Sequence, residues 1–239
     1  MEACISVILA GGPALLLPRD EVPPHRYSYC WHNHANKHTP CELYQRTFDC
    51  VINSVTPDDV IIYAHDDVTI HDADWYTRVM EQFANPQVAA VGLGGAIGLG
   101  HPDLYKRRYQ LNDMARYGYV SNQTDWQTHG ELSTGVTRVA VLDAFFMAVR
   151  VDFLKAVGGW PVDHLSHHCL DLWLACEAAR YGKSIIQVGV SCTHHGGGTS
   201  TKPEYANAKW LQGGSLEKDH QFPHKFLYDQ YRDVLPFAV

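Results

Sequence analysis

The chain has 239 residues, of which 46% are hydrophobic and 19% charged, so it can bury the core of one large domain without staples. Its net charge of −7 argues against a general nucleic-acid-binding surface, which would need a basic face. Seven cysteines without a C-x-x-C pair indicate reduced thiols and therefore a reducing compartment.

The N-terminal stretch "MEACISVILAGG" has no basic segment ahead of an extended apolar run, so it lacks the form of a signal peptide. No other stretch reaches the apolar length that a membrane-spanning helix needs. We therefore expect a soluble cytoplasmic protein with no membrane span.

The first hundred residues alternate between strand and helix patterns. The capping box "TPCE" at residues 39–42 has proline at the first helical position and predicts a helix that ends near Pro57. A second helix is expected after an N-cap at Asp72 or Asp74. Four segments have the apolar or aromatic composition of buried strands: Cys4–Ala10, Arg26–Asn33, Asp59–His65 and Val88–Leu93. This alternation predicts a mainly parallel sheet covered by helices, in which ligands bind outside the carboxyl ends of the strands.

The second half begins with a mostly loop-like stretch, Gly94–Arg138. The sequence "RVAVLDAFFMAVRVDFLKAVGGWP" then predicts a long strand, a short helix from Asp152 and a Gly-Gly turn. "CLDLWLACEAARYG" predicts a helix that ends at Gly182, and "SIIQVGVSC" predicts a buried strand. From Pro203 onward we expect two short helices, the last of which packs back on the domain.

Acidic and imidazole side chains follow two of the predicted buried strands. Asp66 and Asp67 come directly after "VIIYAH", and His194 and His195 follow "SIIQVGVSC". The two acids could instead be an exposed pair or a helix cap. The two histidines could instead be a surface pair in a turn. Together, carboxylate oxygens, one imidazole, diphosphate oxygens and water make a mixed octahedral set that suits Mn²⁺ or Mg²⁺ better than a structural zinc site.

Asp143 interrupts the apolar run "VAVLDAFFMAV". A buried acid needs a partner, because an unpaired charge in an apolar environment is costly. Asp143 is therefore either a structural hydrogen-bond anchor or a ligand to substrate hydroxyls.

The order of these motifs resembles that of a family 2-type glycosyltransferase with the GT-A fold. "SVILAGG" stands at that family's first strand, which contacts the nucleotide base, and "AHDDV" stands at its Asp-x-Asp motif. "VLDAFFMAVRVDFLKAVGGWP" is similar to its acceptor-side segment. "CLDLWLACEAARYGKSIIQVGVSCTHH" is similar to the helix and strand that carry the catalytic base and the distal metal histidine. The match runs from about Cys4 to Thr199 and depends on the order of loose motifs.

The resemblance implies a single GT-A-like α/β domain with a mostly parallel twisted sheet flanked by helices. Residues 1–95 would form a nucleotide-sugar-binding half, residues 96–200 an acceptor and catalytic half, and residues 201–239 a helical tail. It also implies a metal-dependent transfer of a sugar from a nucleotide-diphosphate donor, with a UDP-sugar expected. The acceptor would be the hydroxyl of a saccharide or other molecule, and the transfer would be inverting.

The same resemblance assigns roles to individual residues. Asp67 with His194 or His195 would hold Mn²⁺ or Mg²⁺, and Asp143 is a catalytic candidate on the acceptor side. The Gly-rich segment after these histidines would close over the donor as a lid. The donor-binding candidates are Ala10, Gly11, His32, Asn33, Arg46, Asp66 and Asp67.

The base position departs from the family pattern. The family's Glu-Asp-x-Asp is "HCLD" at residues 168–171, so the usual base position holds Cys169, whose thiol is a poor base for a hydroxyl. Asp171 is the nearest carboxylate and is assigned as the catalytic base, while His167 or His168 would be substitutes.

Two other functions stay open. The thiol at the base position favours a non-catalytic nucleotide-sugar-binding module, which would bind donor and metal without turnover. More distantly, "ILAGG" resembles the opening of sugar nucleotidylyltransferases. The following "PALLLPRD" lacks the further glycine and the lysine that grip a triphosphate in that class, so this alternative is the weaker one.

Overall fold

A computed structural model describes residues 3–9, 28–32, 38–53, 55–65, 67–100, 116–117, 134–194 and 216–239. Its helices are α1 (Pro40–Val51), α2 (Trp75–Gln82), α3 (Val151–Val157), α4 (Leu170–Arg180) and α6 (Leu216–Gln230). Its strands are β1 (Ala3–Leu9), β2 (Ser28–His32), β3 (Val60–His65), β4 (Val68–Ile70), β5 (Val88–Gly92), β6 (Gly95–Ala96), β7 (Gly98–Leu99), β8 (Arg116–Tyr117), β9 (Val136–Val139), β10 (Val141–Leu142), β11 (Phe146–Arg150), β12 (Ser184–Val188), β13 (Cys192–His194) and β14 (Phe237–Ala238).

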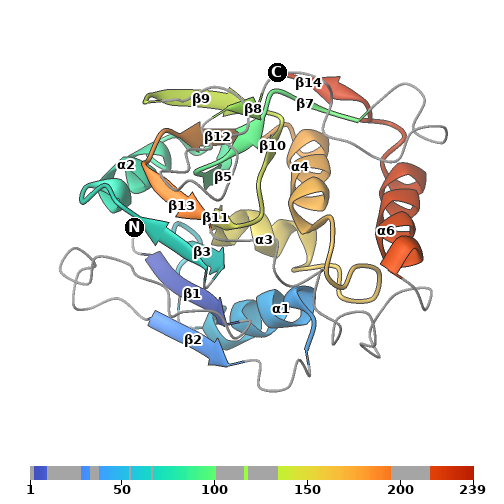
Figure 1. The fold of residues 1–239 in the computed structure, drawn as a ribbon, viewed down its shortest axis with the longest axis horizontal. Helices are drawn as coiled ribbons and strands as arrows, with labels where there is room; N and C mark the ends of the chain where they lie inside the picture. Colours follow the sequence, from blue (N-terminus) through green and yellow to red (C-terminus); the bar gives the residue numbers. More distant parts are fainter. Residues whose placement is uncertain are drawn as a thin grey trace.

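A seven-stranded sheet in the order β2-β1-β3-β11-β5-β12-β9 forms the centre of the molecule (Figure 1). β2, β1 and β3 pair in parallel, as do β5 and β12, while β11 and β9 run antiparallel to their neighbours. Five of the seven strands therefore point the same way, and the expected α/β domain with a mostly parallel sheet is confirmed. The carboxyl ends of these five strands share the edge at which such sheets bind ligands.

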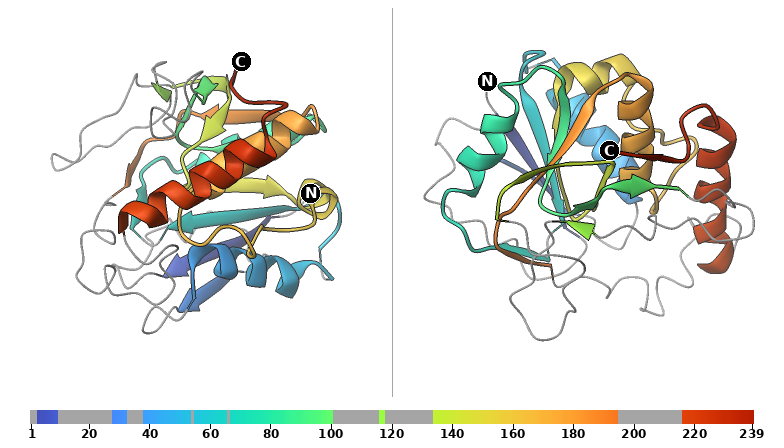
Figure 2. Two further views of the ribbon diagram at one scale, coloured as in Figure 1. Left: turned by 90° about the vertical axis from the view of Figure 1, so that its right-hand side faces the viewer. Right: turned by 90° about the horizontal axis from the view of Figure 1, so that it is seen from above.

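The sequence of β3 shows how the two faces of the sheet are separated. Ile61 and Tyr63 point into a hydrophobic cluster that includes residues of α1, α3 and α4. Val60, Ile62 and Ala64 point into a second cluster, which includes residues of α2. This period of two is what a strand covered on both faces requires. Figure 2 shows the layers, with α2 on one side of the sheet, α1, α3 and α4 on the other, and α6 outside α4.

Two helix ends lie where local signals predict them. Thr39 Oγ1 accepts a hydrogen bond from the amide of Glu42 at 3.2 Å, and Glu42 Oε2 accepts one from the amide of Thr39 at 2.8 Å. The helix that this capping box opens, α1, ends at Val51, before the predicted Pro57. α4 ends just before Gly182, whose φ of 63° is a left-handed conformation that glycine adopts without strain.

The long strand predicted on both sides of Asp143 is broken in the structure. β9 ends at Val139 and β10 at Leu142, a turn covers Asp143–Phe145, and β11 begins at Phe146. β10 pairs with β6 in a smaller sheet, whereas β11 pairs with β3 and β5 in the main sheet. The chain changes sheets here, and the amide of Asp143 is satisfied by the carbonyl of Gly94 at 2.9 Å.

One further segment differs from expectation. The stretch predicted as mostly loop contributes β6, β7 and β8, which pair within small sheets. The described part of the tail holds one helix of 15 residues, α6, and residues 203–215, where the first of the two predicted helices would lie, are outside the described ranges. As predicted, the tail packs back on the domain, because Leu227, Tyr231 and Leu235 are buried in the first cluster.

Five cysteines have described side chains, and none of the five forms a disulfide bond. Cys41, Cys169, Cys176 and Cys192 are buried, and Cys50 is exposed. Within the described ranges, no helix is both long and apolar enough to cross a membrane.

Candidate metal and acid–base site

A two-stranded ribbon beside the main sheet brings two distant parts of the chain together. β4 and β13 pair antiparallel, with Cys192 opposite Ile70 and His194 opposite Val68. Asp67 directly precedes β4, so this register places His194 beside Asp67 at one end of the ribbon, which we call the tip. The sequence predicts both residues for a metal site, and the ribbon explains why they meet.

Three side chains converge at the tip. His194 Nε2 lies 3.3 Å from Asp67 Oδ1, and His65 Nδ1 lies 4.0 Å from the same oxygen. Each residue offers one ligand atom, and these atoms all lie within 4.8 Å of one another. In the described part of the chain, this is the one group of three or more histidine, cysteine or acidic side chains that could hold a metal ion.

His65 is the member of this group for which the sequence predicts no metal role. It ends β3, and its amide donates a hydrogen bond to the carbonyl of Phe145 at 2.9 Å. Its ring lies near that of His194, with centroids 5.5 Å apart. The signal was present, because His65 stands at the first position of the motif "HDD".

The environment of Asp67 suits a cation. Its Oδ1 is buried and accepts no hydrogen bond of good geometry from the described residues, although His194 is close. Burial acts to raise the pKa of Asp67, but the imidazoles of His194 and His65 outweigh it and hold that pKa below its usual value. A carboxylate and two imidazoles are common ligands of divalent metals, so the residues present fit a divalent cation.

The turn Asp143–Phe145 connects the tip to a second polar site. The ring of Phe145 stacks on that of His194, with centroids 4.9 Å apart and planes inclined by 22°. Two residues earlier, Asp143 is close enough to Asp171 of α4 for its charge to act on that carboxyl group. The turn of three residues therefore connects the possible metal ligands His65, Asp67 and His194 to the carboxyl groups of Asp143 and Asp171.

Asp171 has the proton affinity that a general base at neutral pH needs. It lies in the first turn of α4, and its Oδ1 accepts a hydrogen bond from the amide of Leu172 at 2.9 Å. Burial, followed by the negative charge of Asp143, raises the pKa of Asp171 from 3.8 to about 7. The amides of Leu172 and Ala144 favour the ionised form but do not offset these two causes. A carboxyl group with such a pKa exchanges its proton readily near pH 7.

Cys169, at the family's usual base position, faces a residue to which no motif pointed. It precedes α4 with a left-handed φ of 66° and is 9% exposed. Its Sγ lies 3.7 Å from both ring nitrogens of His224 on α6. Since His224 comes from the C-terminal helix, only the packing of that helix beside α4 reveals the contact.

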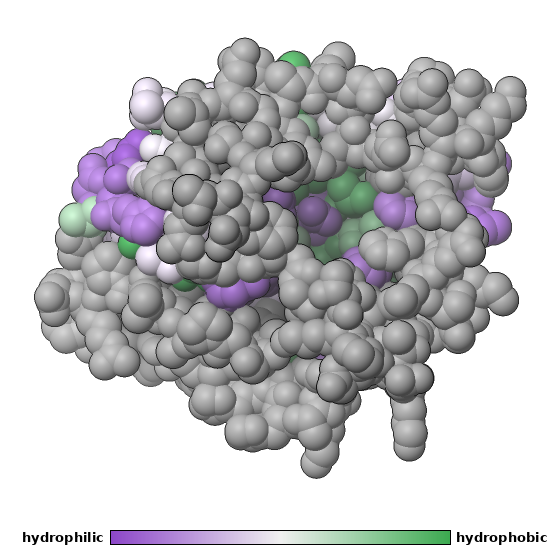
Figure 3. Space-filling view, viewed as in Figure 1, coloured by the Kyte–Doolittle hydropathy of each residue, from purple (hydrophilic) through white to green (hydrophobic). Residues whose placement is uncertain are grey.

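The predicted donor-binding residues are placed only in part. Arg46 is exposed on α1, and the backbone of His32 ends β2 opposite Leu9 of β1. Five predicted residues lie outside the described ranges: Ala10, Gly11, Asn33, Asp66 and His195. Figure 3 shows that this face of the molecule is hollowed near its centre, where hydrophobic and hydrophilic residues both line the hollow. The donor-binding assignments stay predictions.

The chain belongs to the glycosyltransferase like family. The model of that family matches residues 52–211, about two thirds of the chain, and this range contains the tip, the Asp143–Phe145 turn and Asp171. No curated protein matches the chain. The protein is therefore a member of a glycosyltransferase-like family, and its sheet has the mostly parallel α/β arrangement that the order of its motifs predicts.

Three solved structures are similar to this chain at low identity. A197 from STIV is 12% identical, with 81% of this chain and 85% of that chain covered and a TM-score of 0.46. GalNAc-T7 with UDP, GalNAc and Mn²⁺ is 8% identical, with 81% and 43% covered and a TM-score of 0.49. The mannosyltransferase PcManGT from Pyrobaculum calidifontis, in complex with GDP-Man and Mn²⁺, is 14% identical, with 79% and 56% covered and a TM-score of 0.41. The present chain spans about half the length of the last two.

Proposed function

We propose that the protein transfers a sugar from a nucleotide-diphosphate donor, first of all a UDP-sugar, to a hydroxyl of a saccharide or other acceptor. The observation that carries the proposal is the convergence of His65, Asp67 and His194 beside the carboxylates of Asp143 and Asp171. The reaction needs positive charge opposite the leaving diphosphate and a base opposite the acceptor hydroxyl. Side chains suited to both needs adjoin at one edge of the sheet.

On the donor side, Asp67 and His194 would hold Mn²⁺ or Mg²⁺, with His65 as a third ligand and His195 as the sequence-based alternative. When bound, such an ion supplies positive charge against the negative charge that develops on a leaving diphosphate. The lowered pKa of Asp67 keeps its carboxylate ionised at neutral pH, and the stacked ring of Phe145 restricts the orientation of His194. Asp66 would bind the ribose directly or through water.

On the acceptor side, Asp171 would take the proton of the attacking hydroxyl at one of its carboxylate oxygens. Its pKa of about 7 leaves a large ionised fraction at neutral pH and still gives it a useful affinity for that proton. Asp143 would bind acceptor hydroxyls and, by its negative charge, maintain the proton affinity of Asp171. Attack in line with the leaving diphosphate inverts the configuration at the anomeric carbon.

The test is an assay of nucleotide release from a panel of donors. The protein is incubated with UDP-glucose, UDP-galactose or GDP-mannose, with Mn²⁺, with Mg²⁺ or with EDTA, and with and without sugar acceptors. We expect UDP release that requires the metal and rises with an acceptor, and a product whose anomeric configuration, read by NMR, is inverted. Release of GDP alone would overturn the UDP assignment, and a retained configuration would overturn the direct displacement.

Calorimetry with the same donors separates the transferase from a non-catalytic binding module, the alternative that Cys169 favours. Metal-dependent donor binding without turnover on any donor and acceptor would support the module and overturn the transferase. Turnover that Asp67→Ala abolishes would exclude the module.

A further inference from the structure

The tip that carries Asp67 and His194 depends on a very short ribbon. β4 and β13 have three residues each and form a two-stranded sheet of their own. A two-stranded pair is marginally stable by itself in water, so its backbone pairing alone does not fix the tip. Part of the support is apolar, because Val68, Ile70 and Cys192 are buried in the second hydrophobic cluster. The rest comes from polar contacts at the end of the ribbon opposite the tip, which we call its far end.

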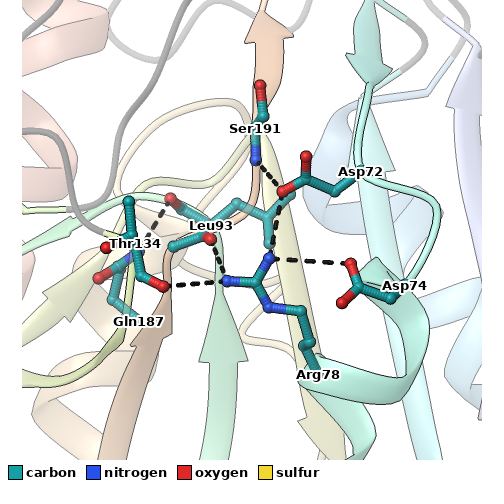
Figure 4. Close-up of polar contacts among 8 residues, drawn as sticks. Asp72, Asp74, Arg78, Leu93, Thr134, Gln187 and Ser191 are labelled. Atoms are coloured by element: carbon teal, nitrogen blue, oxygen red, sulfur yellow. Dashed lines mark hydrogen bonds and ion pairs between the residues drawn. The ribbon is translucent and has the colours of Figure 1, made fainter.

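At the far end, the carboxylate of Asp72 joins the two segments that form the ribbon (Figure 4). Asp72 follows β4 by two residues, and its Oδ2 accepts a hydrogen bond at 2.8 Å from the amide of Ser191, which directly precedes β13. The amide of His71 donates to the carbonyl of Ser191 at 2.9 Å, and His71 Nε2 lies 2.9 Å from Thr193 Oγ1. The end of β4 is thus tied to the start of β13.

Arg78 of α2 extends this connection to the surrounding structure. Its Nη1 donates to Asp72 Oδ2 at 3.1 Å, and its Nη2 donates to the carbonyls of Gly189 and, at 3.2 Å, Thr134. Figure 4 shows Asp72 and Thr134 beside the guanidinium group, together with Asp74, whose Oδ1 forms an ion pair with Nη1 at 3.8 Å. A planar guanidinium with five donors can hold one carboxylate and two carbonyls in fixed directions, which an ammonium group cannot do as well.

We propose that Arg78 and Asp72 are positioning residues for the metal site and act on it through the β4–β13 ribbon. The inference rests on the proposed function in taking Asp67 and His194 as metal ligands. Neither positioning residue belongs to the group of His65, Asp67 and His194, and each fixes the far end of the ribbon. Loss of the Arg78–Asp72 pair lets the two strands separate at the far end, and the ligand atoms at the tip then spread apart. Metal affinity therefore falls while the core of the domain stays folded.

The direct test is the Mn²⁺ affinity of Arg78→Met, measured by calorimetry on metal-free protein without donor. Methionine keeps much of the apolar length of arginine and removes every hydrogen bond of its guanidinium. We expect an affinity about tenfold weaker, the low end of what loss of a residue that supports metal ligands costs. Arg78→Lys should recover part of the loss, because the ammonium group still reaches Asp72 but cannot also hold the carbonyls of Gly189 and Thr134.

Arg180→Met is the matched control. Arg180 also donates to a backbone carbonyl, that of Gln230, and pairs with an aspartate, Asp233, at 3.1 Å. These contacts join α4 to the C-terminal segment instead of the ribbon. Both variants should lose a similar amount of thermal stability, whereas only Arg78→Met should lose Mn²⁺ affinity.

Hydrogen exchange at the amides of β13 separates failure of this inference from failure of the metal site. Arg78→Met should speed this exchange, and Arg180→Met should not. An unchanged Mn²⁺ affinity in Arg78→Met, in a protein whose binding Asp67→Ala abolishes, would overturn the positioning role and leave the metal site intact. If the wild-type protein binds no Mn²⁺, the metal part of the proposed function fails, and unchanged exchange in Arg78→Met would then overturn the ribbon support as well.

Discussion

Asp67 and Asp171 carry the same chemical group at the same edge of the sheet, yet their pKa values are shifted in opposite directions. Burial acts to raise both. Around Asp67 the imidazoles of His194 and His65 outweigh burial, whereas around Asp171 the negative charge of Asp143 adds to it. The neighbouring side chains, and not the residue type, determine that one carboxylate stays ionised and the other exchanges a proton near pH 7.

The largest effect is expected from Asp171→Asn, which keeps the shape of the side chain and removes its ability to accept a proton. We expect kcat to fall by about 10²- to 10⁴-fold, the usual contribution of a general base. Donor and Mn²⁺ affinities should stay near those of the wild type, because the change lies on the acceptor side. Steady-state kinetics and calorimetry check both parts, and near-normal turnover would exclude Asp171 as the base and leave His167, His168 or Cys169.

Asp67→Ala should affect the opposite side of the comparison. Its loss removes a proposed metal ligand, so Mn²⁺ affinity should weaken by more than about 100-fold, beyond the usual cost of losing a supporting residue. Turnover at limiting Mn²⁺ should fall in parallel. Carboxyl NMR of this variant should still place the pKa of Asp171 at about 7, since the two causes of that shift, burial and Asp143, remain. Wild-type affinity in Asp67→Ala would remove this residue from the ligand set.

Asp143→Asn tests the electrostatic origin of the difference. Because Asp171 must be ionised to take a proton, wild-type kcat/KM should rise with pH through about 7. Without the negative charge of Asp143, ionised Asp171 is less disfavoured, so its pKa falls and the acidic limb moves to lower pH. Burial still holds that pKa above its usual value. The pH profile checks the shift, and a limb that does not move would belong to a group other than Asp171.

Most of the fold could be predicted because its elements carry local signals. The capping box at residues 39–42, the glycine after α4 and the period of two in β3 each depend on a few adjacent residues. The break at Asp143 is different, because an apolar run that passes from one sheet to another has the same composition as one long strand. Only the pairing of β10 with β6 and of β11 with β3 and β5 separates the two cases.

The candidate site divides along the same line. Asp67 and His194 could be predicted, since side chains at the ends of buried strands gather at one edge of a parallel sheet. The positioning role proposed for Arg78 could not, because its partners depend on how α2 lies against the segment before β13. The contact of His224 with Cys169 could not be predicted either, since it depends on how α6 packs beside α4.

Cys169→Ser should have the smallest effect and decides whether the family's usual base position is in use. Serine keeps the size of the side chain, and its hydroxyl cannot replace a thiolate as a base. If Asp171 is the base, turnover should change by no more than roughly threefold. If Cys169→Ser and His224→Gln each lower kcat by about 10²-fold or more with donor binding intact, while Asp171→Asn leaves kcat near that of the wild type, the thiol–imidazole pair takes part in the proton transfer. The division of labour would then lie between Asp67 and Cys169, and the raised pKa of Asp171 would reflect its burial beside Asp143 without a catalytic role.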